Sequence, residues 1–139
     1  MTNKVFLDTA YAIALSVEPD EHHERAEKLA VQLETEQTRL VTTRAILLEI
    51  GNSLSKHRYR QAAAKLLDAL EEDSSVEIVP LSEELYGQAL ELFRSRTDKE
   101  WSLVDCASII VMQQRGLTEI LTTDEHFKQA GFRALLRDE

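Results

Sequence analysis

Four acidic residues stand where a carboxylate needs an explanation. Two end short apolar runs that favour β-strands and two interrupt apolar helical stretches: Asp8, Asp124, Glu49 and Asp105. A carboxylate beside a protein core is costly unless it is paired, hydrogen-bonded or bound to a cation. Four such residues, spread along one chain, suggest a shared metal site.

The chemistry of such a site follows from its charge. Converging carboxylates repel one another, and a hard divalent cation removes the repulsion. Mg²⁺ and Mn²⁺ prefer oxygen ligands, and Mg²⁺ keeps several waters while it takes one or two carboxylates and a phosphate oxygen. This arrangement suits phosphodiester cleavage, because one ion lowers the pKa of an attacking water and a second can stabilise the leaving oxygen. No Cys/His set in the sequence has the spacing of a zinc site.

Each acid also has a purely structural explanation. Asp8 and Asp124 could cap the helices that follow their strands, and Glu49 could lie on a solvated face. Asp105 stands three residues after Ser102, a pattern typical of a capping box at a helix start. Helical periodicity favours the site, since Glu49 falls at the rim of an apolar arc and the face of Asp105 points inward.

Strand-like runs alternate with helical patterns. Strands are expected at residues 4–8, 39–42, 76–80 and 119–123, with a weaker one near 132–136. Helices are expected near residues 9–16, 20–36, 44–55, 58–72, 82–96, 103–115 and 125–130. Asp20 and Ser82 are predicted N-caps, and Gly116 is predicted to end a helix. The alternation predicts an α/β fold with a mostly parallel, four- to five-stranded sheet and helices on both faces.

Such a sheet binds its ligands beyond the carboxyl ends of the strands, where Asp8 and Asp124 are expected. The 139 residues have an ordinary composition, so we expect one domain, residues 1–139. The single cysteine, Cys106, cannot form an internal disulfide, and no uncharged stretch reaches the roughly 18–20 residues that span a bilayer. Asp8 interrupts the apolar N-terminal run, which we do not interpret as a signal peptide. We expect a cytoplasmic protein with no membrane partner.

The formal net charge of −9 disfavours simple attraction to nucleic acid. A nucleic-acid partner would therefore need a local basic patch, or a metal at the acidic centre. The densest basic stretch contains Lys56, Arg58 and Arg60, with Tyr59 between them. These side chains could hold phosphates and stack a base, and the alternative is a solvated loop.

Four segments resemble the signatures of PIN-domain ribonucleases, and most closely those of VapC-type toxins of bacterial and archaeal toxin–antitoxin pairs. The segments are residues 6–9, 48–49, 101–108 and 121–127. The resemblance covers nearly the whole chain in the correct order, and Trp-Ser-Leu-x-Asp at 101–105 is its most specific element. It implies a three-layer α/β/α fold, Mg²⁺- or Mn²⁺-dependent RNA cleavage, a cognate antitoxin and a homodimer.

The resemblance also assigns roles to single residues. The acidic quartet of the family, with catalytic and metal-binding roles, corresponds to Asp8, Glu49, Asp105 and Asp124. Asp98 matches a further acid that some relatives carry.

The chain departs from its relatives at Ala10, where many carry a small hydroxyl residue. Thr9, Ser102 and Thr123 are therefore candidates for an auxiliary hydroxyl. An antitoxin is expected to cover the RNA-binding surface and to place an arginine against the carboxylates, which would exclude the metal.

Two other classes of function fit the sequence less well. A phosphoryl-aspartate protein also carries an Asp at the end of its first strand. The phosphatase type needs a second Asp two residues later, where Ala10 stands, and the receiver type needs a lysine at a late strand end, where Thr123 and Asp124 stand. The complete quartet argues against the other class, a PIN-fold interaction module without activity.

Overall fold

The computed structural model describes residues 1–137, and the last two residues of the predicted 1–139 domain lie outside the described residues. Within this range, five parallel strands form one sheet in the order β3-β2-β1-β4-β5. The strands are β1 (Lys4–Leu7), β2 (Arg39–Thr43), β3 (Val76–Val79), β4 (Glu119–Leu121) and β5 (Arg133–Ala134). The predicted α/β class and its parallel sheet are confirmed.

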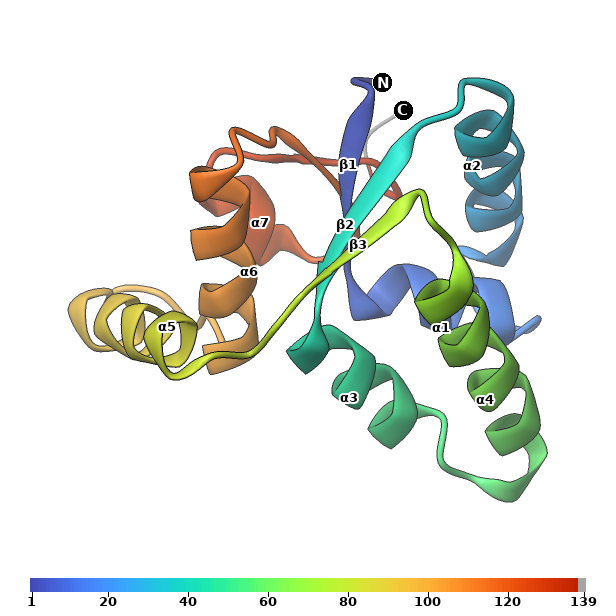
Figure 1. Ribbon diagram of the computed structural model, residues 1–139, viewed down its shortest axis with the longest axis horizontal. Helices are drawn as coiled ribbons and strands as arrows, with labels where there is room; N and C mark the ends of the chain where they lie inside the picture. Colours follow the sequence, from blue (N-terminus) through green and yellow to red (C-terminus); the bar gives the residue numbers. More distant parts are fainter. Residues whose placement is uncertain (138–139) are drawn as a thin grey trace.

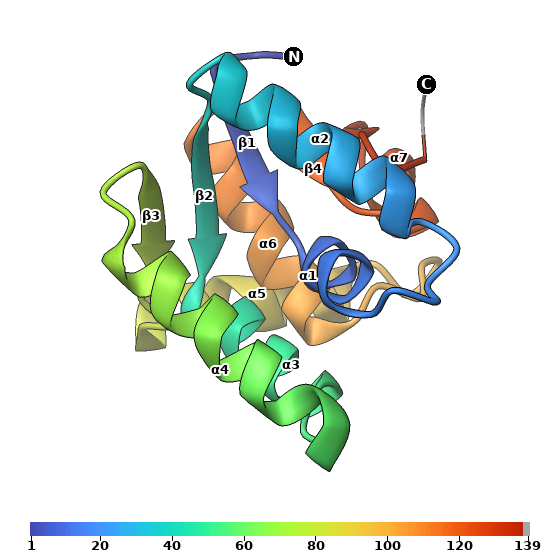
Figure 2. The ribbon, with the colours of Figure 1, turned by 90° about the vertical axis from the view of Figure 1, so that its right-hand side faces the viewer.

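Helices cover both faces of the sheet, as Figures 1 and 2 show. Helices α1, α2 and α4 lie on one side, and α5, α6 and α7 lie on the other, which makes three layers. No helix within residues 1–137 is long and apolar enough to cross a membrane. The helices are α1 (Thr9–Ser16), α2 (His23–Thr35), α3 (Arg44–Ser53), α4 (His57–Glu72), α5 (Glu83–Ser95), α6 (Leu103–Gln114) and α7 (Glu125–Gln129).

The central strand β1 shows why the sequence forms this architecture. Its residues Val5, Phe6 and Leu7 are all buried, as expected for a parallel strand that is covered on both faces. Helix α6 packs a continuous apolar face against the sheet, with Ile109 and Met112 fully buried. Burial of these side chains supplies the main driving force that holds the layers together.

The predicted helix ends are mostly those of the structure. The Ser82 hydroxyl accepts a hydrogen bond from the Leu85 N–H (3.1 Å) and caps α5, while Gly116 follows α6 with a φ of 64°. The prediction for Asp20 was wrong, because α2 begins at His23 and its N-cap is His22. Asp20 instead accepts a hydrogen bond from the His22 N–H (2.8 Å), since an Asp side chain readily closes a turn two residues ahead.

The register of the sheet positions the candidate site. Leu7 of β1 pairs with Leu121 of β4, so Asp8 leaves β1 beside Thr122. The chain after β4 then turns through Asp124 into α7. Because all five strands are parallel, these residues emerge at the same end of the sheet, beyond the carboxyl ends of the strands, which point downwards in Figure 1.

Candidate metal centre

Asp8 is the most buried of the four acids, with 7% of its surface exposed. Its Oδ2 accepts a hydrogen bond from the hydroxyl of Thr122 (2.7 Å). Asp8 is the N-cap residue of α1, but its side chain makes no capping hydrogen bond within the described part of the chain. Burial raises the pKa of Asp8 to about 7, and the negative charges of Asp105 and Glu49 act in the same direction. The hydrogen bonds from Thr122 and from the Thr9 backbone lower that pKa and offset part of the effect.

Glu49 projects from the middle of α3 and is half-buried. Its Oε1 accepts a hydrogen bond from the hydroxyl of Thr9, the first residue of α1 (2.5 Å). Thr9 was one of the predicted auxiliary hydroxyls, and the structure shows that it contacts Glu49. The contact joins α1 to α3 and sets the direction of the carboxylate. The negative charge of Glu49 is also one of the causes that raise the pKa of Asp8.

Asp105 lies in the first turn of α6 and takes part in a complete capping box. Its Oδ2 accepts from the Ser102 N–H (3.0 Å), and the Ser102 hydroxyl accepts from the Asp105 N–H (3.0 Å). The structural explanation of this acid is therefore correct. It does not exclude a metal-binding role, because the capping contacts also fix the position of the carboxylate.

Asp124 caps α7 and meets Asp105 through a histidine. Its Oδ1 accepts from the His126 N–H (2.9 Å). The His126 ring reaches both acids, with Nδ1 2.9 Å from Oδ2 of Asp105 and 3.2 Å from Oδ1 of Asp124. The three side chains each offer a ligand atom, and these atoms lie within 4.8 Å of one another. Asp105, Asp124 and His126 thus form a compact set of oxygen and nitrogen donors.

The pKa of His126 reflects this acidic setting. Partial burial lowers it, but the hydrogen bond to Asp105 and the charges of Asp124, Asp105 and Glu100 outweigh that effect. The net result is a pKa above the ordinary value for histidine. The two acids therefore favour the protonated form of the imidazole.

The four predicted acids lie in one region of the structure, where they form two groups that interact with each other. Asp105 and Asp124 belong to the compact donor set, and Asp8 interacts with the charges of Asp105 and Glu49. Carboxylate donors suit a hard divalent cation, and the imidazole adds a donor that such sites also accept. The residues present therefore fit a divalent metal ion.

The predicted auxiliary residues Ser102 and Asp98 lie in different surroundings. Ser102 contacts Asp105 as described, but the predicted acid Asp98 is exposed and pairs with Arg96 (3.0 Å) and Lys99 (4.0 Å). Arg96 holds the pKa of Asp98 below its usual range, so this acid is satisfied within a surface ion-pair cluster.

The structure places two further polar residues, Thr122 and His126, at the acids. Thr122, the neighbour of the predicted Thr123, donates a hydrogen bond to Asp8 (2.7 Å), and its hydroxyl accepts one from the Asp124 N–H (3.1 Å). His126 follows the strand-end Asp124 by two residues, and from the sequence we favour a surface role at a helix start over an approach to the acids. In the structure its ring contacts both Asp105 and Asp124.

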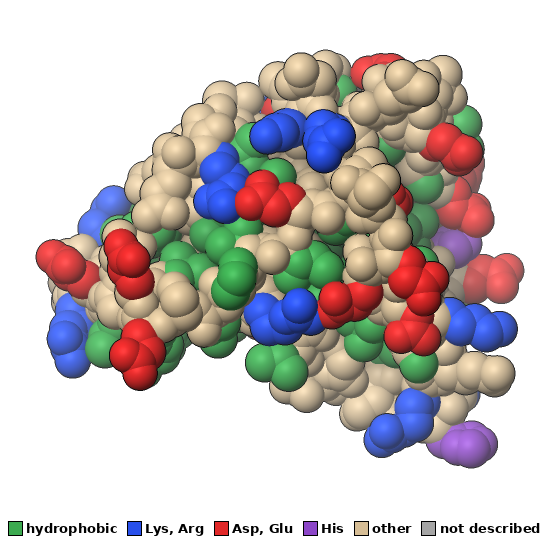
Figure 3. Space-filling view, in the orientation of Figure 1, with side chains coloured by type: hydrophobic (Ala, Val, Ile, Leu, Met, Phe, Trp, Pro, Cys, Tyr) green, Lys and Arg blue, Asp and Glu red, His purple; other side chains and the backbone are tan. Residues whose placement is uncertain are grey.

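Lys56, Arg58 and Arg60, the predicted RNA-binding residues, are exposed where α3 joins α4. The Arg58 guanidinium lies 5.2 Å from the ring centroid of Tyr59. This connection projects from the same end of the molecule as the carboxyl ends of the strands (Figure 1). On the face shown in Figure 3, basic and acidic side chains of the described residues are interleaved, so contact with RNA would depend on local groups.

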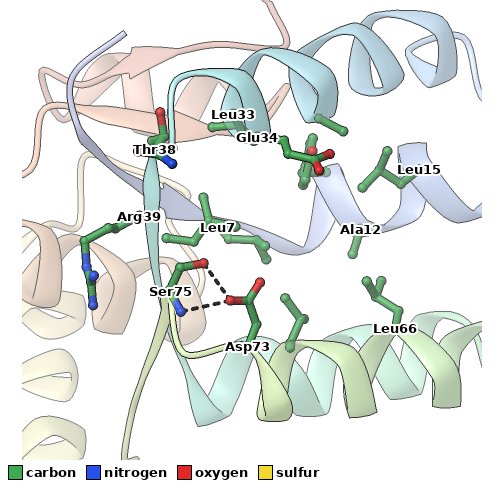
Figure 4. A pocket seen from close by; sticks show the side chains of 15 residues that line it. Leu7, Ala12, Leu15, Leu33, Glu34, Thr38, Arg39, Leu66, Asp73 and Ser75 are labelled. Atoms are coloured by element: carbon green, nitrogen blue, oxygen red, sulfur yellow. Dashed lines mark hydrogen bonds between the residues drawn. The ribbon is translucent and has the colours of Figure 1, made fainter.

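A pocket of about 710 Å³ lies between α1, α2 and α4, against β1 and β2 (Figure 4). Leu7, Leu15, Leu33 and Leu66 give it an apolar wall. Its polar lining includes Glu34, Thr38, Arg39 and Asp73. The described residues that line this pocket do not include the four acids, so it is a feature separate from the candidate metal centre.

Comparison with known proteins identifies the family of this chain. The PIN domain model matches residues 5–133. Two curated relatives, both named 23S rRNA-specific endonuclease VapC20, come from Mycobacterium tuberculosis strains CDC 1551 / Oshkosh and ATCC 25618 / H37Rv. Each is 28% identical over 131 residues, which cover 92% of this chain and 95% of the relative.

Solved structures agree with the sequence match. The crystal structure of Mycobacterium tuberculosis VapC20, described as a sarcin–ricin loop cleaving toxin, has a TM-score of 0.82 and 26% identity, covering 92% of this chain and 95% of that one. FitAcB from Neisseria gonorrhoeae has a TM-score of 0.60 and 19% identity over 94% of each chain, a likeness of fold alone. This chain therefore belongs to the PIN domain family.

Proposed function

We propose that this protein is a divalent-metal-dependent endoribonuclease and the toxin of a toxin–antitoxin pair. One observation carries the proposal: Asp105 and Asp124 lie close together beyond the carboxyl ends of the strands of a PIN-fold sheet, and Asp8 interacts with the charge of Asp105. Similarity over nearly the whole chain to proteins named as rRNA-specific endonucleases supports RNA as the substrate. Membership of the PIN domain family argues against the alternative of a phosphoryl-aspartate phosphatase or receiver.

The carboxylates Asp8, Asp105 and Asp124 would hold the ion, with Glu49 completing the quartet. When bound, a divalent ion supplies Lewis acidity and lowers the pKa of an attacking water. The chain contributes orientation, because hydroxyl and backbone donors hold each carboxylate before the ion arrives. Mg²⁺ and Mn²⁺ are the proposed ions, since both prefer oxygen ligands.

The proposed substrate is ribosomal RNA, by similarity to the named relatives, and the proposed location of the activity is the cytoplasm. Lys56, Arg58 and Arg60 are the proposed phosphate contacts, because they are exposed and lie at the same end of the molecule as the strand ends. The proposed antitoxin covers this surface and directs an arginine at the carboxylates, where it would occupy the place of the cation.

The proposed homodimer would form through α5. Tyr86 and Phe93 lie seven residues apart on this helix, on one face, and each is 47% exposed. The first turn carries Glu84 and the last turn carries Arg94. Two copies of α5 packed antiparallel would bury the aromatic rings and bring Glu84 of one chain near Arg94 of the other.

The test of the enzymatic proposal uses purified protein, ribosomal RNA and a chelator. RNA should be cut with added Mg²⁺ or Mn²⁺, remain intact with chelator, and remain intact with the Asp105→Asn variant. Asp98→Asn is the matched control, because it removes one exposed carboxylate that is paired within a surface cluster, and it should cut like the parent.

Cleavage that persists in chelator or in Asp105→Asn would overturn the proposed chemistry. A parent protein that folds and binds metal but leaves RNA intact would instead support a PIN-fold interaction module without activity.

A further inference from the structure

His126 occupies a position that the acidic quartet does not explain. It is the second residue of α7, and its backbone N–H is held by the Asp124 side chain (2.9 Å). The imidazole points toward α6, where Nδ1 meets Oδ2 of Asp105 (2.9 Å). The same nitrogen lies 3.2 Å from Oδ1 of Asp124.

These separations match the edges of an octahedral metal site. Two ligands at about 2.1 Å from an ion, at a right angle, are about 3.0 Å apart. Nδ1 of His126 lies close to that distance from one oxygen of Asp105 and from one of Asp124. An ion bound between Nδ1 and either oxygen would need little movement of the side chains, and the three ligand atoms all lie within 4.8 Å of one another.

The surroundings of the ring also suit a ligand. The His126 side chain is 29% exposed, whereas that of Asp105 is 13% exposed, so the site is open on the histidine side. Water molecules or a phosphate oxygen could complete the coordination there. The buried carboxylate of Asp8 interacts with the charge of Asp105.

We propose that Nδ1 of His126 is a direct ligand of the catalytic ion, together with Asp105 and Asp124. The inference rests on the proposed metal-dependent function and extends it to the choice of ion. Imidazole nitrogen favours transition-metal ions over Mg²⁺, whereas an all-oxygen site suits both. The donor set therefore makes this centre selective for Mn²⁺ over Mg²⁺.

The experiment measures metal binding without RNA. Mn²⁺ is added to metal-free protein, and pulsed electron paramagnetic resonance detects any ¹⁴N nucleus bound directly to the ion. Titration calorimetry then gives the affinities for Mn²⁺ and Mg²⁺. The variant is His126→Asn, and the control is His22→Asn, which replaces a histidine at the start of α2.

We expect a directly bound nitrogen in the parent and in His22→Asn, and none in His126→Asn. The Mn²⁺ affinity of His126→Asn should fall about 10- to 100-fold, with a smaller loss for Mg²⁺. His126→Asn could also weaken α7, but the nitrogen signal of the parent alone decides the point.

Mn²⁺ bound by the parent without a nitrogen signal would overturn the assignment of His126 and leave the proposed ribonuclease intact. His126 would then be a hydrogen-bond partner that the ion displaces. A parent that binds neither Mn²⁺ nor Mg²⁺ would overturn both the inference and the proposed metal-dependent function.

Discussion

Thr122 donates a hydrogen bond to Asp8 at 2.7 Å between two side chains that are 114 residues apart and both buried. It stands where the chain leaves β4, and Asp8 stands where it leaves β1. The same hydroxyl accepts from the Asp124 N–H, so one threonine links two predicted acids. Neighbouring strand ends therefore hold the carboxylates in place before any ion binds.

Replacing Thr122 by valine should weaken metal binding. The substitution keeps the shape of the side chain but removes the hydrogen bond that favours ionised Asp8, so the pKa of Asp8 should rise further. The metal-free protein should lose about 1 kcal/mol of stability, since one buried hydrogen bond disappears. Calorimetric Mn²⁺ titration and urea unfolding would measure the two effects.

Thr42→Val is the matched control for that variant. Thr42 is also buried at a strand end, and its hydroxyl donates to the Leu7 carbonyl (2.9 Å) rather than to a carboxylate. The control should lose similar stability and keep its metal affinity. Equal losses of metal affinity in both variants would show that Thr122 acts through packing alone.

The stability of the metal-free protein should fall as the pH rises. The folded-state pKa of Asp8 is about 7, against an ordinary value of 3.8, so the folded state binds the extra proton between these pH values. The contribution of Asp8 to the free energy of unfolding is fully present below about pH 4 and is lost as the pH rises to about 7. The upper bound of this contribution is about 4 kcal/mol. His126, whose pKa is also raised, acts in the same direction near neutrality.

Urea unfolding with chelator at pH 5 to 8 would measure this dependence, and Asp8→Asn should remove most of it. Metal affinity should change in the opposite direction, because a cation needs the ionised carboxylate and affinity therefore grows as the pH rises. A parent and an Asp8→Asn variant with identical pH profiles would contradict the raised pKa.

Divalent ions should stabilise the fold against heat. An ion that binds only the folded state raises its stability by about 2.7 kcal/mol at a concentration 100 times its Kd. Melting with and without millimolar Mg²⁺ or Mn²⁺ should show an upward shift in the parent and none in Asp105→Asn. Asp124→Asn should keep part of the shift, since a more exposed carboxylate can act through water. An unchanged shift in Asp105→Asn would place the bound ion elsewhere.

Neutralising the basic stretch should weaken RNA binding. Lys56, Arg58 and Arg60 changed to glutamine should lower affinity and flatten its dependence on salt. The slope of log K against log salt should decrease by up to about 2, because each contact with single-stranded RNA contributes about 0.7. Filter binding at several salt concentrations would measure the slope, and Mn²⁺ affinity should be nearly unchanged.

The control for charge removes three exposed lysines elsewhere, Lys4, Lys28 and Lys65, and should leave the slope close to that of the parent. If the first triple variant behaves like the parent, RNA contacts another surface. The next residues to test would be Arg94, Arg96 and Lys99.

Exposed aromatic residues on α5 predict the oligomeric state. Light scattering after size exclusion should give a dimeric mass for the parent and a monomeric mass for a Tyr86→Ser, Phe93→Ser double variant. Val31→Ser is the control, because Val31 is an exposed apolar residue on α2. A monomeric parent, or a dimeric double variant, would show that this face of α5 does not form the interface.

The sequence by itself determined the order of elements and the strand-end positions of two acids. Alternation of apolar runs with helical periodicity depends on local spacing, so the strand before Asp8 and the helix around Asp105 were both predicted. Capping depends on spacing as well, which explains the success at Ser82 and Ser102. Asp20 shows the limit, since a turn residue and a cap residue have the same local chemistry.

Only the tertiary structure decided which polar side chains meet the acids. Thr122 and Thr123 are equivalent by composition, and the register of β4 against β1 selects Thr122. His126 reaches Asp105, 21 residues earlier in the chain, because α7 packs against α6. Such pairings depend on which elements lie side by side in the folded chain, and no local sequence pattern encodes that arrangement.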